Sequence, residues 1–212
     1  YSVWRHRLGT AQREDVCVYE EADPGFFVSV ARTSSRAFIV INTHDHETGE
    51  FYFIPAGSPT DMPRLVAERE EGVEYDLDHH SDRFIIRTNA DGAEDYKLVT
   101  APVAAPARAN WTDLVAHQEG TLVLGTDVTK DYLVRLERVE GLPRIVVREW
   151  ATGQEHAIVM EEEAYALGLG GGYEFDTGTL RFVYSSMTTP GETYDSVSYT
   201  HLRAHETDTD LV

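Results

Sequence analysis

Histidine and carboxylate residues cluster at two places where they could bind a metal ion. The string "THDHE" covers Thr43–Glu47, and "DHH" covers Asp78–His80. Neutral imidazole and carboxylate are good zinc ligands, but a zinc site needs three or four ligands that converge. Each cluster stands at a predicted turn, and nothing in the sequence brings the two together. We interpret both as solvated turn residues, so the sequence predicts no metal-binding residues and no cofactor.

Two adjacent serines and the single cysteine are the candidate nucleophiles. A serine on a strand-to-helix elbow needs the motif G-x-S-x-G, which does not occur in these 212 residues. Ser185 and Ser186 stand in "YSSMTTP", a strand end that runs into a proline turn. Cys17 lies in the alternating string "DVCVYEE", with no activating partner beside it. We expect structural serines, a small packed cysteine and no catalytic residue in this chain.

A glycine-rich string, "GLGGGYEF" at Gly168–Phe175, resembles a phosphate-binding loop. The third glycine of G-x-G-x-x-G is replaced by Tyr173, and no helix is predicted after it. We therefore expect a flexible loop between strands.

The elements that would position these residues are short strands rich in Val, Ile, Phe and Tyr, separated by polar turns. Four times a strand, a polar turn and a more apolar strand follow one another, with turns near Ser34, Ser81, Glu119 and Thr177. The steps between these turns are 47, 38 and 58 residues. A period near 48 residues is typical of β-propeller blades. The sequence predicts an all-β partial propeller of about three to four blades, incomplete at both ends.

The charge balance is strongly acidic, with 18 basic and 37 acidic residues and a net charge of −19. This charge disfavours nucleic acid as a partner and is compatible with cationic ligands. No apolar run is long enough for a membrane helix. A single cysteine, Cys17, fits a reducing compartment such as the cytoplasm.

Several strings together resemble the oligopeptidase B (protease II) group of the prolyl oligopeptidase family of serine peptidases. They are "VWRHRLGT", "FFVSVARTSSRAFIVI", "YDLDHHSDRFIIRTN" and "YSSMTTPGETYD", and the similarity runs from Tyr1 to Asp195. The resemblance implies the C-terminal half of a seven-bladed propeller that caps and gates an α/β-hydrolase domain. The implied activity is cleavage of short peptides after Lys or Arg. In the family, the catalytic Ser, Asp and His come after the region that this sequence resembles, so the fragment itself should be inactive. The alternative is a stand-alone, non-catalytic propeller that binds a partner.

The last residues do not continue this resemblance. The string "SVSYTHLRAHETDTDLV", residues 196–212, resembles the translation of a transposon-end sequencing adapter. In one reading frame that DNA encodes Ser196–Glu206, passes through an index and resumes at Leu211 and Val212. His201 and His205 would then imitate an H-x-x-x-H metal motif. We expect residues 1–195 to be propeller and 196–212 to be non-native sequence.

Overall fold

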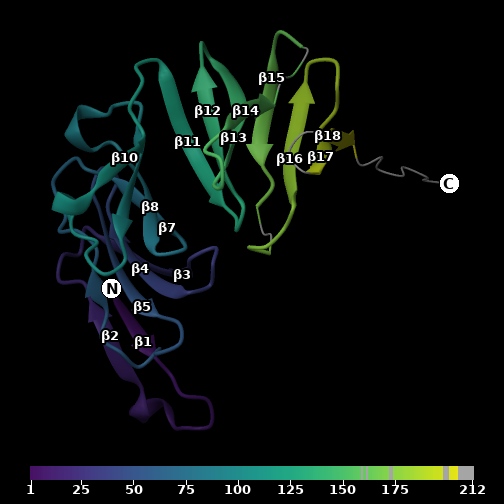
Figure 1. The fold of residues 1–212 in the computed structure, drawn as a ribbon. Coiled ribbons are helices and arrows are strands. Elements are labelled where there is room, and N and C mark those ends of the chain that lie inside the picture. Colours follow the sequence, from purple (N-terminus) through teal and green to yellow (C-terminus); the bar gives the residue numbers. More distant parts are fainter. Residues whose placement is uncertain (159, 161, 172–173, 198–200, 205–212) are drawn as a thin grey trace. The chain divides into compact units, whose positions relative to one another are not determined.

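The structure is a computed structural model that describes residues 1–158, 160, 162–171, 174–197 and 201–204. It contains four four-stranded sheets and one two-stranded sheet, and every strand pair is antiparallel. In each four-stranded sheet the strands neighbour one another in chain order, which is the arrangement of a propeller blade (Figure 1). The prediction of an all-β partial propeller is therefore confirmed.

The chain divides into two units, of which the first is Tyr1–Ala116. It holds the two-stranded sheet, two four-stranded sheets and three single-turn 3-10 helices, η1 (Gln12–Glu14), η2 (Ala90–Gly92) and η3 (Arg108–Asn110). The strands of its three sheets are, in order, β1 (Ser2–Arg5) and β2 (Val16–Glu20); β3 (Phe27–Arg32), β4 (Phe38–His44), β5 (Gly49–Pro55) and β6 (Arg64–Leu65); β7 (Tyr75–His80), β8 (Arg83–Thr88), β9 (Lys97–Pro102) and β10 (Thr112–Val115).

The second unit is His117–Val212 and holds the other two four-stranded sheets. Their strands are, in order, β11 (Thr121–Val128), β12 (Tyr132–Val139), β13 (Leu142–Glu149) and β14 (Glu155–Ile158); β15 (Tyr165–Leu169), β16 (Thr179–Ser186), β17 (Glu192–Val197) and β18 (His201–Ala204).

Each unit has its own hydrophobic core between its two four-stranded sheets. Alternation along a strand places every second side chain on one face, so Phe38 of β4, Phe53 of β5 and Phe84 of β8 meet there. Their ring centroids lie 5.0–5.6 Å apart, in edge-to-face contacts. In the second unit Val134 and Val147 pack in the same way against Phe182.

The repeat is more regular than the turns of the sequence suggest. The first strands of the four sheets begin at residues 27, 75, 121 and 165, so the steps are 48, 46 and 44 residues. Three predicted turns, near Ser34, Ser81 and Thr177, do lie between the first two strands of a sheet. The prediction for Glu119 is wrong, because this turn follows β10 and precedes β11, where one sheet ends and the next begins.

Candidate functional site

Asp78 and His79 lie inside β7 and not in a turn, so the turn prediction for "DHH" is wrong. The β7–β8 connection consists of Ser81 and Asp82 alone, which leaves the whole triplet in the strand. The carboxylate of Asp78 accepts hydrogen bonds from the backbone N–H (2.8 Å) and the hydroxyl (2.6 Å) of Ser34. Because Ser34 belongs to the β3–β4 turn, this contact fastens the two sheets of the first unit.

His79 supports the same junction from inside the core. Its Nδ1 hydrogen-bonds the Ser35 hydroxyl at 2.8 Å, and its ring contacts Phe38 edge-on with centroids 4.8 Å apart. The side chain is 6% exposed, and this burial lowers its pKa because a charged imidazolium would be poorly solvated. His79 therefore packs between the sheets as a neutral residue.

The "THDHE" string forms the end of β4 and its turn into β5. Thr43 and His44 are strand residues, which corrects their assignment to the turn. Asp45 builds the turn itself, since its Oδ1 accepts the backbone N–H groups of Glu47 (2.8 Å) and Thr48 (2.7 Å). These hydrogen bonds lower the pKa of Asp45, so its carboxylate is charged at neutral pH.

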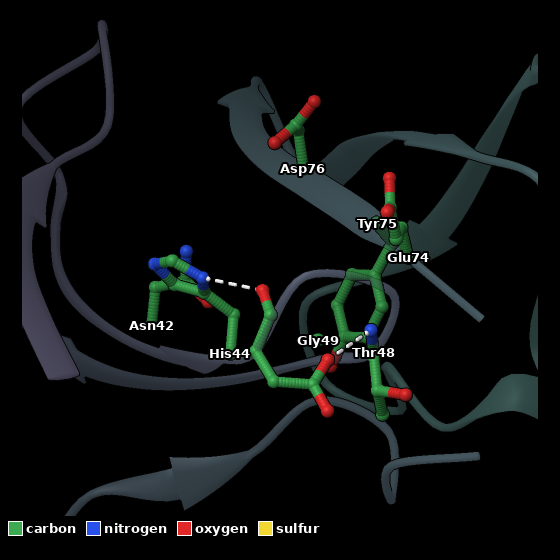
Figure 2. A pocket seen from close by; sticks show the side chains of 8 residues that line it. Asn42, His44, Thr48, Gly49, Glu74, Tyr75 and Asp76 are labelled. Carbon is green, nitrogen blue, oxygen red and sulfur yellow. Dashed lines mark hydrogen bonds between the residues drawn. The ribbon is translucent and has the colours of Figure 1, made fainter. Parts of the chain in front are cut away.

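A pocket of about 310 Å³ opens beside this turn, between β4–β5 and the start of β7, and we call it the inter-sheet pocket. Figure 2 shows Asn42 and His44 on one side of it and Glu74, Tyr75 and Asp76 on the other. Asp45 also lines it, and His44 donates a hydrogen bond from Nδ1 to the Asp45 carbonyl at 3.0 Å. The pocket is thus formed by two different sheets of the first unit.

Hydrogen-bond acceptors dominate this lining. Asp76 pairs with Arg87 (Oδ2–Nη1 2.7 Å), and Glu74 accepts the hydroxyl hydrogen of Tyr96. Among the described residues, no group of three or more His, Cys, Asp or Glu side chains is placed to hold a metal ion. The arrangement suits recognition of a hydrogen-bond donor more than covalent chemistry.

The remaining candidates have local roles. The Ser186 hydroxyl accepts the backbone N–H groups of Thr188 and Thr189 at 3.1 and 2.9 Å, and so stabilises the turn after β16. Cys17 lies on β2 as expected, but it is exposed, and the prediction of a packed cysteine is wrong. The reason is that β2 belongs to a sheet of only two strands. Cys17 is paired across this sheet with Trp4, which is also exposed.

The glycine-rich string is only partly a loop. Gly168 and Leu169 belong to β15, so the loop prediction is wrong for them. Gly172 and Tyr173 lie outside the described residues. Of the tail histidines, His201 is in the backbone of β18, and His205 is outside the described residues.

Sequence reasoning missed Asn42, Glu74 and Asp76 as residues of one pocket. Each stands in an ordinary strand pattern, and the pocket exists only because two hairpins lie side by side. The clustering of His44 and Asp45 in "THDHE" was the one sequence signal near it.

The comparisons with known proteins all indicate the same family. The family described as "Prolyl oligopeptidase, N-terminal beta-propeller domain" matches residues 1–203. Dipeptidyl aminopeptidase BI of Pseudoxanthomonas mexicana is 40% identical over 193 residues, which cover 91% of this chain and 26% of that protein. Protease 2 of Moraxella lacunata is 29% identical over 193 residues, with 91% and 27% covered. The chain thus spans about a quarter of the length of these curated relatives.

Solved structures agree with this result. Oligopeptidase B of Leishmania major superposes with a TM-score of 0.88 at 32% identity, over 96% of this chain and 30% of that one. Oligopeptidase B of Trypanosoma brucei, with covalently bound antipain, gives 0.89 at 28% identity and the same coverage. Within the described part of the chain, no helix has the length and apolarity that a membrane span requires.

Proposed function

The chain belongs to the prolyl oligopeptidase family of serine peptidases, in whose N-terminal β-propeller domain it lies, and from this we propose that it is part of an enzyme that cleaves short peptides after Lys or Arg. The likeness to two oligopeptidase B structures across 96% of the chain carries this proposal. The acidic balance of the chain, −19, also favours basic peptides over acidic ones.

In this proposal the propeller has a steric role and the chemistry belongs to a C-terminal α/β-hydrolase domain outside these residues. That domain would supply a Ser-His-Asp triad and an oxyanion hole for acyl transfer. The propeller would cover the active site, exclude folded proteins and admit short chains when the two domains open. The 212-residue chain alone would then be inactive. We also propose a cytoplasmic location, which the single cysteine supports.

The test is hydrolysis by the protein expressed from its complete gene. We expect cleavage of an amino-blocked arginyl amide, loss of that activity after a serine-reactive inhibitor, and little cleavage of the matching glutamyl amide. The 212-residue chain serves as the inactive control. A complete protein that hydrolyses none of these substrates would support the stand-alone binding module instead.

A second candidate activity is release of dipeptides from a free amino terminus. It is favoured by the name of the 40% identical relative, dipeptidyl aminopeptidase BI. Two substrates separate the candidates, a dipeptidyl amide with a free amino terminus and the same compound with the terminus acetylated. An oligopeptidase of the oligopeptidase B type should accept the acetylated form, whereas a dipeptidyl aminopeptidase should reject it.

We further propose that residues 196–212 are adapter-derived and that the natural propeller sequence in this chain is residues 1–195. Ser196 supports this, since it is 1% exposed and its buried hydroxyl has no hydrogen-bond partner among the described residues. Such a hydroxyl is costly, so an apolar residue is expected at this position of a natural blade. Pairing of β18 with β17 is compatible with the proposal, because a free strand edge accepts many sequences. Long-read sequencing of the source DNA across the Asp195 codon tests it, and natural DNA that encodes "SVSYTHLRAHET" would refute it.

A further inference from the structure

Two neighbouring residues of β7 hold the turn between β3 and β4, residues 33–37, against the second sheet. Asp78 accepts hydrogen bonds from the backbone N–H (2.8 Å) and the hydroxyl (2.6 Å) of Ser34. His79 hydrogen-bonds the hydroxyl of Ser35 through Nδ1 at 2.8 Å. We call these two contacts the turn clasp. Histidine is the side chain whose ordinary pKa lies near physiological pH, so one half of the clasp is able to respond to mild acid.

The turn is strained, and its own hydrogen bonds pass through Ser35. Arg36 has a φ of 58°, in the left-handed region that favours glycine. The Ser35 Oγ lies 3.0 Å from Oγ1 of Thr33 and accepts the backbone N–H of Ala37 at 3.3 Å. The residue that His79 contacts therefore also orders the turn. The clasp helps to keep Arg36 in a conformation that it would leave if the turn were free.

The surroundings of the His79 ring favour its neutral form. The side chain is 6% exposed, and it meets the rings of Phe38 and Phe84 edge-on with centroids 4.8 and 6.0 Å away. Burial lowers the pKa of His79, and this effect outweighs the hydrogen bond with the Ser81 backbone and the charge of Asp82, which both act in the opposite direction. A proton on this ring is therefore costly while the clasp is closed.

The charges around the ring compensate such a proton only in part. The charged or titratable groups on the adjoining elements are Asp78 and His80 of β7, Asp82 of the β7–β8 turn, Arg83 of β8 and Arg36 of the β3–β4 turn. Asp82 shares its charge with Arg83, since Oδ1 and Nε are 3.1 Å apart. Asp78 is engaged with Ser34, and the charge of His80 lowers the pKa of His79 further.

We propose that His79 is an acid-sensitive switch in the first unit, which releases the turn clasp in mildly acidic solution and lets the β3–β4 turn separate from β7. Protonation makes both ring nitrogens donors, so the Ser35 hydroxyl can no longer donate to the ring. Opening returns the imidazolium to water and relieves the strain at Arg36. The switch belongs to the propeller and requires no peptidase activity.

The direction of the pH dependence follows from the lowered pKa of His79 in the closed state. In the open state the ring has its ordinary pKa of about 6.5. The clasp is therefore fully stabilised above pH 6.5, and its stability falls as the pH drops from there towards the pKa of the closed state. This range lies above the one in which carboxylates such as Glu21 take up protons.

The test is hydrogen exchange of the complete protein, followed by mass spectrometry at pH 7.5 and pH 5.5 and corrected for the intrinsic pH dependence of exchange. The reporter is the segment 33–38, in which the Ser34 N–H donates to Asp78. We expect the corrected exchange of this segment to rise about three- to tenfold at pH 5.5, the range open to one titrating histidine. Strands β12 and β13 of the second unit are the internal reference and should not change.

Two variants connect the effect to His79. His79→Asn keeps a hydrogen-bonding group near the position of Nδ1, and His79→Phe keeps an aromatic ring, but neither titrates in this range. Both should remove the difference between pH 7.5 and pH 5.5. His46→Asn is the control, because His46 is exposed in the β4–β5 turn, and it should leave the difference unchanged.

Three results would overturn the proposal. They are equal corrected exchange of the wild-type segment at the two pH values, a pH difference that persists in the His79 variants, or a parallel rise in β12 and β13, which would indicate general acid unfolding. If His79→Phe fails to fold because Ser35 loses its partner, His79→Asn and the wild-type protein still decide the question.

Discussion

Glu21 connects the two-stranded sheet to the first four-stranded sheet through hydrogen bonds that depend on its negative charge. Its Oε2 accepts three hydrogen bonds of 2.7 Å, from Arg69 Nη2, the Thr43 hydroxyl and the Tyr19 hydroxyl. Its Oε1 accepts the backbone N–H of Asp23 at 3.0 Å. The side chain is 5% exposed, so the carboxylate has exchanged water for these donors. Neutralising it should therefore destabilise the fold.

The size of the effect follows from the pKa. Burial alone would raise the pKa of Glu21, but the hydrogen bonds, led by that from Arg69, lower it from 4.5 to about 2. Each pH unit corresponds to about 1.4 kcal/mol, so the ionised form contributes about 3 kcal/mol to the free energy of unfolding at neutral pH. Because the folded pKa is below the unfolded one, this contribution is complete above pH 4.5 and is lost as the pH falls towards 2.

The assay is equilibrium urea unfolding, followed by circular dichroism, of the wild type and Glu21→Gln between pH 7 and pH 2.5. We expect a loss of about 2–3 kcal/mol at pH 7, which shrinks steadily below pH 4.5 as the wild type is protonated. Glu20→Gln is the control, since Glu20 is the exposed last residue of β2, directly before Glu21, and its replacement should change stability by less than about 0.5 kcal/mol. Equal losses in the two variants, or a Glu21→Gln loss that is the same at pH 7 and pH 2.5, would refute the reasoning.

Three further predictions use the same unfolding assay. Asp78→Asn should destabilise by about 1–3 kcal/mol, because it weakens two hydrogen bonds from Ser34, whereas the exposed Asp82→Asn should not; equal effects would show that the sheets are not fastened there. Arg135→Met should cost about 3–5 kcal/mol, since it leaves Glu137, 2% exposed, without one of its two arginines, and a loss below about 1 kcal/mol would contradict this. Ser196→Val should stabilise by about 1 kcal/mol, because it removes a buried hydroxyl that has no partner within the described part of the chain. Ser185→Val on the neighbouring strand is the comparison, and a destabilising effect of Ser196→Val would contradict this prediction.

The sequence predicts the type of fold because its strands are locally evident. Short β-branched and aromatic runs between polar turns give the correct all-β class, and three of four predicted turns fall between first and second strands. The turn at Glu119 was placed wrongly for a physical reason. A strand, a polar turn and a strand have the same local pattern within a sheet and between two sheets, since the difference lies in which strands share hydrogen bonds. β10 pairs with β9, and β11 pairs with β12.

The pocket could not be predicted from local sequence patterns for a related reason. Asn42 and Asp76 are separated by a complete β5–β6 segment, and only the packing of two sheets brings them to one cavity. His79 shows the same limit, because a histidine beside a turn looks solvated in sequence but here it is 6% exposed. His79 follows Tyr75 and Leu77 on the inward face of β7, and this alternation becomes informative only when the strand is known to continue to His80 instead of ending in a turn.

Net charge is a weak guide to a binding site, and the structure shows where its information lies. The acidic excess of −19 is compatible with solubility alone. Some carboxylates are already paired inside the molecule, as Glu21 and Glu50 are with the single cation of Arg69. Others remain largely exposed although they are paired, as Asp76 does with Arg87 beside the inter-sheet pocket. Net charge therefore says more about this protein when each carboxylate is sorted by its partner and its exposure, which is why Glu21→Gln and the exposed Glu20→Gln should differ in stability although they remove the same charge.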